Sequence, residues 1–138
     1  METMTFKRLA VIGLVLVGIS TNLSAAVSSV SKFRVITQGG RVDVAQHVVL
    51  GRVTLVDFYA DWCGPCRMIS PYLESLAANN PQIVLRKIDI VRWNTPICQQ
   101  YRINGVPQVW VFDKRGRFVG RVEGVDIAGV NALVAQAL

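Results

Sequence analysis

The hydrophobic positions along the chain fall into short runs with the spacing of β-strands and longer stretches with the spacing of helices. The strand-like runs are rich in β-branched and aromatic residues and are bounded by turn residues. The run Val53–Tyr59 is apolar almost throughout, which is typical of a strand buried on both faces. Strands are therefore predicted at 33–37, 53–59, 83–90, 109–112 and 117–122.

Helices are predicted in the intervals between the first four strands and after the last strand. In 67–78 apolar side chains recur at helical spacing, and Pro71 within this segment predicts a kink because it removes a hydrogen bond. The segment 42–50 is ambiguous, and a short helix is favoured there because Gly51 follows as a stop signal. Two further helices are predicted to begin at capping residues. One covers 96–101 and ends at Tyr101, and the other covers 126–137 and ends at Ala137.

The order of these elements predicts how the strands pair. The turn 113–116 joins the last two strands and is a strong hairpin signal, whereas helical segments separate the earlier strands and allow parallel pairing. Helices are then available to cover both faces of the sheet. The sequence thus predicts an α/β fold with a central mixed β-sheet flanked by helices, in one domain at 27–138.

The first residues have the features of an export signal and are not expected to be part of this domain. Lys7 and Arg8 precede an apolar run at 9–19, and a segment of small residues ends at Ala25 and Ala26, where cleavage is plausible. The alternative is an uncleaved membrane anchor, but an apolar run of this length spans about 16 Å, short of the ~30 Å hydrocarbon core. We therefore expect a cleaved secretory signal peptide at 1–26 and a periplasmic protein, with secreted or membrane-anchored forms as alternatives.

The charge and the cysteine content of the chain exclude some classes of function and favour another. The net charge of +6 comes from scattered basic residues without a stripe of interleaved aromatics, so no nucleic acid partner is expected. The chain has three cysteines, whereas a framework of structural disulfides uses an even number. Cys63 and Cys66 form a Cys-x-x-Cys pair and Cys98 stands apart, which favours redox chemistry.

The Cys-x-x-Cys pair directly follows a predicted buried strand and opens a predicted helix. Unpaired backbone N–H groups and the helix dipole favour a thiolate at that position. Cys63 is therefore the predicted exposed attacking thiol, and Cys66 the shielded resolving thiol that closes an intramolecular disulfide. The alternative is half of a zinc site, but the remaining candidates Cys98 and His47 have no partners at ligand spacing, so no metal is expected.

The residues around this pair resemble a known family. The segment 57–67, Asp-Phe-Tyr-Ala-Asp-Trp-Cys-Gly-Pro-Cys-Arg, resembles the active-site segment of thioredoxins. Pro71, the pair Val106-Pro107 and Gly124 also match family positions, so the resemblance covers roughly 33–138. It implies the thioredoxin fold, no cofactor besides a redox-active Cys63–Cys66 disulfide, and protein disulfides as substrates.

The resemblance also implies roles for individual residues. A carboxylate in an apolar strand is costly without a task, and Asp57 matches the family's buried acid, which takes the proton of Cys66. Pro107 is expected to be cis, with Val106 offering backbone groups to an extended substrate chain. An apolar docking platform around Cys63 is implied for Trp62, Gly64, Pro65, Val106, Gly124 and Val125.

The sequence departs from the family pattern at several positions. Leu85 aligns with the lysine that relatives place near the buried acid, and Lys87 lies two residues on, so the charge partner of Asp57 stays open. The stretch 91–94 lengthens a connection, and Trp93 within it is expected to fill the core, with an added partner contact as the alternative. Gln108 replaces a usual threonine, which predicts altered partner preference, and Cys98 is expected to be a small buried hydrophobe.

Taken with the signal peptide, these features predict an exported thiol–disulfide oxidoreductase that reduces or isomerises protein disulfides. The Gly-Pro dipeptide resembles reducing members of the family, while export indicates an oxidising compartment, and reduction is favoured. We expect a monomer that a membrane electron donor re-reduces. The alternatives are a binding or assembly module whose cysteines are not essential, and a peroxidase, which would need an Arg and Thr around its cysteine.

Overall fold

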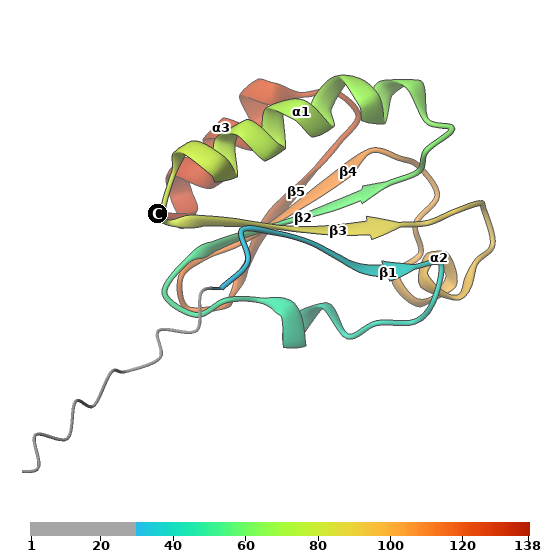
Figure 1. The fold of residues 1–138 in the computed structure, drawn as a ribbon, viewed down its shortest axis with the longest axis horizontal. Helices are drawn as coiled ribbons and strands as arrows, with labels where there is room; N and C mark the ends of the chain where they lie inside the picture. The colour runs from blue at the N-terminus through green and yellow to red at the C-terminus, as the bar shows by residue number, and fades with distance from the viewer. Residues whose placement is uncertain (1–29) are drawn as a thin grey trace, which may run out of the picture.

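The computed structural model describes residues 30–138, so the predicted signal peptide at 1–26 lies outside the described residues. A five-stranded mixed sheet forms the centre, in the order β1-β3-β2-β4-β5 (Figure 1). The strands β1, β2 and β3 are mutually parallel, and β4 and β5 complete the sheet in antiparallel pairing. The predicted α/β fold is confirmed, with strands β1 Phe33–Gln38, β2 Val53–Tyr59, β3 Ile83–Asp89, β4 Gln108–Phe112 and β5 Phe118–Glu123.

Helices lie on both sides of the sheet. The long helices α1 (Gly64–Asn79) and α3 (Ile127–Ala137) cover one face, and the 3₁₀ helix η1 (Val44–His47) and α2 (Pro96–Tyr101) lie at the other (Figure 1). Among residues 30–138, no helix is long and apolar enough to cross a membrane.

The strand β2 is buried on both faces, as its apolar run predicts. Its alternate side chains enter two separate cores, because successive residues of a strand point to opposite sides of the sheet. Val53 and Leu55 pack with residues of α1 and α3, whereas Val56 and Phe58 pack with Ile97 of α2 and its neighbours. The sheet thereby positions the carboxyl end of β2, where α1 begins.

One helical segment differs from the expectation, and another agrees with it. The ambiguous segment 42–50 forms only the turn η1, because Asp43 caps it by accepting a hydrogen bond from the Ala45 N–H at 3.0 Å and Val48 is already extended. Helix α1 begins at Gly64, directly after Cys63, which agrees with the prediction that the Cys-x-x-Cys pair opens a helix, and Pro71 lies within it.

The packing of α1 generates a first prediction. Ile69 is fully buried in the core beneath α1 and α3, whereas the neighbouring Met68 has 69% of its surface exposed. Ile69→Ala removes buried methylene groups and leaves a cavity, so we expect a loss of about 2–5 kcal/mol in the free energy of unfolding. Met68→Ala, the matched control, changes it by less than about 0.5 kcal/mol. Urea denaturation followed by circular dichroism measures both, and equal losses would contradict the packing described.

Candidate active site

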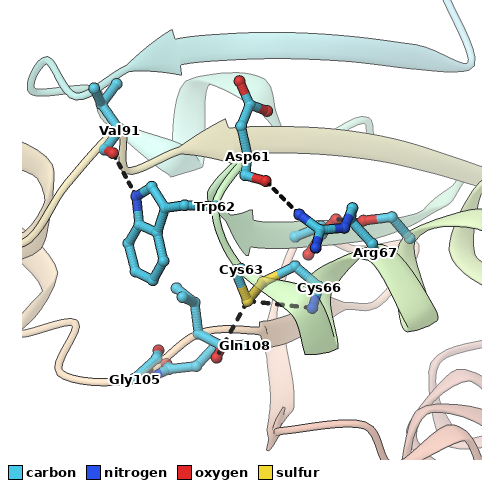
Figure 2. The surroundings of a disulfide bond; sticks show 11 residues. Asp61, Trp62, Cys63, Cys66, Arg67, Val91, Gly105 and Gln108 are labelled. Atoms are coloured by element: carbon cyan, nitrogen blue, oxygen red, sulfur yellow. Dashed lines mark hydrogen bonds between the residues drawn. A yellow bond between two sulfur atoms is a disulfide. The ribbon is translucent and has the colours of Figure 1, made fainter.

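The cysteine pair lies where α1 begins, at the carboxyl end of β2. Cys63 and Cys66 are joined in a disulfide, with a Cα–Cα distance of 5.3 Å (Figure 2). Cys63 is the N-cap of α1, and its Sγ accepts a hydrogen bond from the Cys66 N–H at 3.2 Å. The first helical turn contains Pro65, whose missing N–H costs nothing at a helix start. The sulfur of Cys63 therefore occupies the positive end of the helix, where a thiolate is stabilised.

The expected exposure of Cys63 is wrong for this disulfide-bonded form. Cys63 keeps only 4% of its surface in contact with solvent, and Cys66 keeps 1%. The reason is tertiary, because the loop before β4 lies beside the carboxyl end of β2 and the Val106 carbonyl oxygen is 3.7 Å from Cys63 Sγ. Cys63 is still the outer sulfur of the pair, but attack on a partner needs the reduced form, in which the sulfurs are no longer bonded.

The loop that covers Cys63 contains a cis peptide bond between Val106 and Pro107, as predicted. Pro107 is buried, and its carbonyl accepts a hydrogen bond from the N–H of Gly124 at 2.9 Å. Gly124 has φ +77°, a conformation that favours glycine. The structure thus brings Cys63, Val106, Pro107 and Gly124 into one contiguous site.

The side chain of Gln108 also belongs to this loop. It is 2% exposed, and its Nε2 donates a hydrogen bond to the carbonyl of Gly105 at 3.1 Å. The expected effect of Gln108 on partner preference therefore cannot come from direct contact with a partner. Its hydrogen bond to Gly105 holds the loop, and an effect on partner preference stays a prediction.

The platform predicted around Cys63 is only partly exposed. Trp62 keeps 51% of its surface in solvent and Val125 keeps 41%, and Pro65 is also exposed. Gly64 and Gly124 are half-buried, like Val106. The indole Nε1 of Trp62 donates a hydrogen bond to the carbonyl of Val91 at 2.7 Å (Figure 2).

Asp57 lies in β2, fully buried under the cysteine pair on the side of α1. Burial raises the pKa of its carboxyl group to about 6, because the charged form loses its contact with water. The ammonium group of Lys87 and a hydrogen bond from Ser70 Oγ to Asp57 Oδ2, at 3.1 Å, oppose this rise, and Glu74 adds to it. Among residues 30–138, the other oxygen, Oδ1, has no hydrogen-bond partner.

Strand register gives Asp57 a charged neighbour, Lys87, although the ion pair of Lys87 is made with Glu74. Asp57 pairs with Lys87 across the parallel strands β2 and β3, so both side chains point to the same face. Lys87 is held by an ion pair with Glu74 at 2.7 Å and lies over the ring of Tyr59. A cavity of about 380 Å³ is lined in part by Cys66, Ser70, Glu74 and Lys87, whereas Asp57 itself is not part of this lining.

Ser70 is the site residue that the sequence analysis missed. The available signal was its position four residues after Cys66, which places both side chains on one face of α1. Its role as hydrogen-bond donor to Asp57 depends on the docking of α1 onto β2.

The expectation that Trp93 fills the core is wrong. Trp93 keeps 43% of its surface exposed, and its ring contacts the ring of Trp62 edge to face, with centroids 5.4 Å apart. Trp93 is kept at the surface because the connection between β3 and α2 lies at the edge of the sheet beside the active-site turn. Cys98, in contrast, is a free and buried thiol, as predicted.

Metal binding finds no support in the part of the chain that the structure describes. Within 30–138, no group of three or more His, Cys, Asp or Glu side chains is placed to hold a metal ion. Cys63 and Cys66 are joined to each other, and His47 lies in η1, on the face of the sheet opposite to α1.

Comparison with known proteins identifies the family. The Thioredoxin family profile matches residues 24–136. Thioredoxin from Chlamydia pneumoniae is 44% identical over 73 residues, covering 53% of this chain and 70% of that protein. Thioredoxin from Echinococcus granulosus is 33% identical over 93 residues, covering 67% of this chain and 85% of that protein.

Solved structures agree with the sequence comparison. The crystal structure of reduced Schistosoma mansoni thioredoxin superimposes with a TM-score of 0.62 at 27% identity, covering 78% of this chain and 100% of that one. Spinach chloroplast thioredoxin f has a TM-score of 0.63 at 21% identity and supports the fold alone. With a matching family profile, a shared fold and a disulfide-bonded Cys-x-x-Cys pair, the chain belongs to the thioredoxin family of disulfide oxidoreductases.

Proposed function

We propose that this protein is an exported oxidoreductase that reduces or isomerises disulfides in other proteins through Cys63 and Cys66. The observation that carries the proposal is the cysteine pair at the N-terminus of α1, with the buried Asp57 beneath it and the cis-Pro loop beside it. Family membership supports protein disulfides as the substrate class.

The reaction starts from the dithiol form. The Cys63 thiolate attacks one sulfur of a substrate disulfide, so that a mixed disulfide forms and the other substrate sulfur leaves as a thiolate, which takes up a proton. Cys66 then loses its proton and attacks Cys63 Sγ, which releases the second substrate thiolate. The substrate gains two electrons and two protons in total, and the protein is left with the Cys63–Cys66 disulfide present in the structure.

Asp57 is the proposed proton acceptor for Cys66. A carboxyl group with a pKa of about 6 is ionised at neutral pH and is still basic enough to accept a proton from a thiol. Ser70 holds one oxygen of this group, and the other is without a partner among the described residues. The cavity beside Cys66 and Lys87 offers a path by which the proton returns to solvent.

Substrate docking is proposed on the surface around Cys63. The half-buried backbone of Val106 beside the cis-Pro bond suits a short strand-like pairing with an extended substrate chain. The exposed side chains of Trp62, Pro65 and Val125, with the glycines Gly64 and Gly124, leave the neighbourhood open to a partner.

The site of action is proposed from the sequence of the first residues. The basic, apolar and small-residue segments within 1–26 support export to the periplasm, followed by cleavage. In that compartment the disulfide must be re-reduced by an external donor, for which a membrane protein is proposed. The protein is proposed to act as a monomer, and the Gly-Pro dipeptide supports a reducing role.

Substitution of either cysteine tests whether the protein is an enzyme or only a binding module. We expect Cys63→Ser to lower insulin reduction to the uncatalysed rate, because it removes the attacking sulfur. Cys66→Ser leaves the attack intact and prevents resolution, so it accumulates mixed disulfides that mass spectrometry identifies. Cys98→Ser, at a buried thiol outside the site, is the control and keeps full activity. Full activity of Cys63→Ser would favour the binding-module alternative.

Substitution of Asp57 tests its role as proton acceptor, because we expect it to slow the reaction and at the same time to stabilise the folded protein. Asp57→Asn is expected to slow the resolving step by about 10²-fold or more at pH 7, because it removes the general base. The same variant is expected to be more stable than the wild type at pH 7. In the folded protein the pKa is raised from 3.8 to about 6, so the wild type loses stability as pH rises through this interval.

The pKa of this fully buried group differs by roughly 2 units between the unfolded and the folded protein, which corresponds to about 3 kcal/mol in the free energy of unfolding. Denaturation at pH 3 and pH 8 measures it, and the gain of the variant should be confined to the higher pH. A variant that is both slower and less stable at pH 8 would mean that Asp57 is a structural group.

Export is tested with a chain that includes residues 1–26. We expect the full chain, expressed in a bacterium, to be found in the periplasm and to begin near residue 26 or 27. Leu14→Arg places a charge within the apolar run and is expected to keep the protein in the cytoplasm. An unprocessed wild-type chain in the membrane fraction would favour the anchor, and a soluble cytoplasmic one would contradict export.

A further inference from the structure

The connection between β3 and α2 holds two residues in the left-handed backbone region. Val91 has φ 62° and Asn94 has φ 61°. For a β-branched residue such as valine this conformation costs about 1–3 kcal/mol, so the surrounding contacts must impose it. Backbone strain of this kind is concentrated at functional sites.

Several contacts hold this connection in one shape. Asp89 Oδ1 accepts a hydrogen bond from the Val91 N–H at 2.7 Å, and Thr95 Oγ1 donates to the carbonyl of Ile90 at 3.0 Å. A Cβ added at Gly39, at the end of β1, would lie 3.5 Å from the Val91 side chain and 3.4 Å from Thr95. The connection is therefore packed against the sheet edge and is not a free loop.

The consequence of this shape is an aromatic pair beside the disulfide. The Val91 carbonyl is directed at the Trp62 indole, which donates to it at 2.7 Å (Figure 2). Trp93 then contacts Trp62 edge to face. We call Trp62, Val91 and Trp93 the indole surface; these side chains are 51%, 46% and 43% exposed.

The indole surface is suited to binding and not to packing. Large apolar side chains that are fixed yet half in solvent contribute little to the core, and rigid aromatics lose little entropy when a partner covers them. Trp93 is not needed to fill either core, because neither core contains it. It lies at the surface instead, against the ring of Trp62, the residue before Cys63.

The place of the indole surface decides which part of a substrate it meets. Trp62 directly precedes Cys63, and the cis-Pro loop lies on another side of the same sulfur (Figure 2). A chain bonded to Cys63 in a mixed disulfide and paired with Val106 is extended, with about 3.3 Å per residue. The ring centre of Trp93 is 5.4 Å from that of Trp62, which adjoins Cys63, so the indole surface lies beside the path of a chain bonded to that sulfur.

We propose that Trp93 is a specificity-determining residue: the indole surface binds a large apolar or aromatic side chain within two residues of the attacked cysteine of an extended protein substrate. This inference rests on the proposed function, because it assumes that Cys63 forms mixed disulfides with proteins. The occupant follows from the continuity of the surface with Cys63, since any chain bonded to that sulfur must pass beside it.

The test uses two synthetic peptides joined through a disulfide to the same fluorophore, identical except for Phe or Gly next to the cysteine. The ratio of kcat/KM for the Phe peptide to that for the Gly peptide measures the preference. We expect Trp93→Ala to lower this ratio about 3- to 10-fold, mainly through a higher KM for the Phe peptide, because one aromatic contact is lost. Trp93→Phe is expected to restore most of the ratio.

The matched control is Leu50→Ala, at an exposed apolar residue just before the start of β2, at the opposite end of that strand from Cys63. It should leave the ratio unchanged. If Trp93→Ala slows both peptides by one factor, Trp93 has a structural role only and the inference is overturned. A dimer that sedimentation detects in the wild type and not in Trp93→Ala would assign the surface to self-association and would also overturn it.

The two proposals fail in distinguishable ways. A wild-type protein that reduces neither the peptides nor a small aromatic disulfide contradicts the proposed function and this inference together. A wild type that reduces both peptides, with the same ratio in Trp93→Ala, contradicts this inference alone.

Discussion

The start of helix α1 is the constraint on which the rest of the site depends. Cys63 is extended and caps the helix, so its sulfur receives the Cys66 N–H and lies at the positive end of the helix dipole. The helix keeps this position because its apolar side, with Ile69, Leu73 and Ala77, is fully buried against the sheet. The reactivity of one sulfur is therefore tied to the packing of the larger core.

The same packing creates a conflict beneath the disulfide. Asp57 occupies a position in β2 where Val53 and Leu55 on the same face are purely apolar, and burial there opposes its charge. Lys87 and Ser70 relieve this conflict only in part, because Lys87 is also paired with Glu74. A buried carboxyl group with a pKa of about 6 is a poor structural element and a suitable proton acceptor.

Two connections lie beside Cys63 and its preceding residue, Trp62. The cis-Pro loop covers the sulfur from one direction and presents backbone, whereas the connection after β3 places Trp93 against the indole of Trp62. Both are fixed by hydrogen bonds to neighbouring elements, such as the bond between Gly124 and Pro107. The site therefore combines the backbone edge proposed to pair with any extended chain and the apolar surface proposed to select side chains.

The amino-acid sequence by itself determined the elements and the chemistry of the pair. The apolar run of β2, the hairpin at 113–116 and the Cys-x-x-Cys at a helix start are local patterns, and local backbone preferences suffice to recognise them. Tertiary structure alone decided that Lys87 faces Asp57, that Val106 covers Cys63 and that Trp93 stays at the surface. Those outcomes depend on strand register and on which loop covers which edge, and both arise from contacts between residues far apart in the chain.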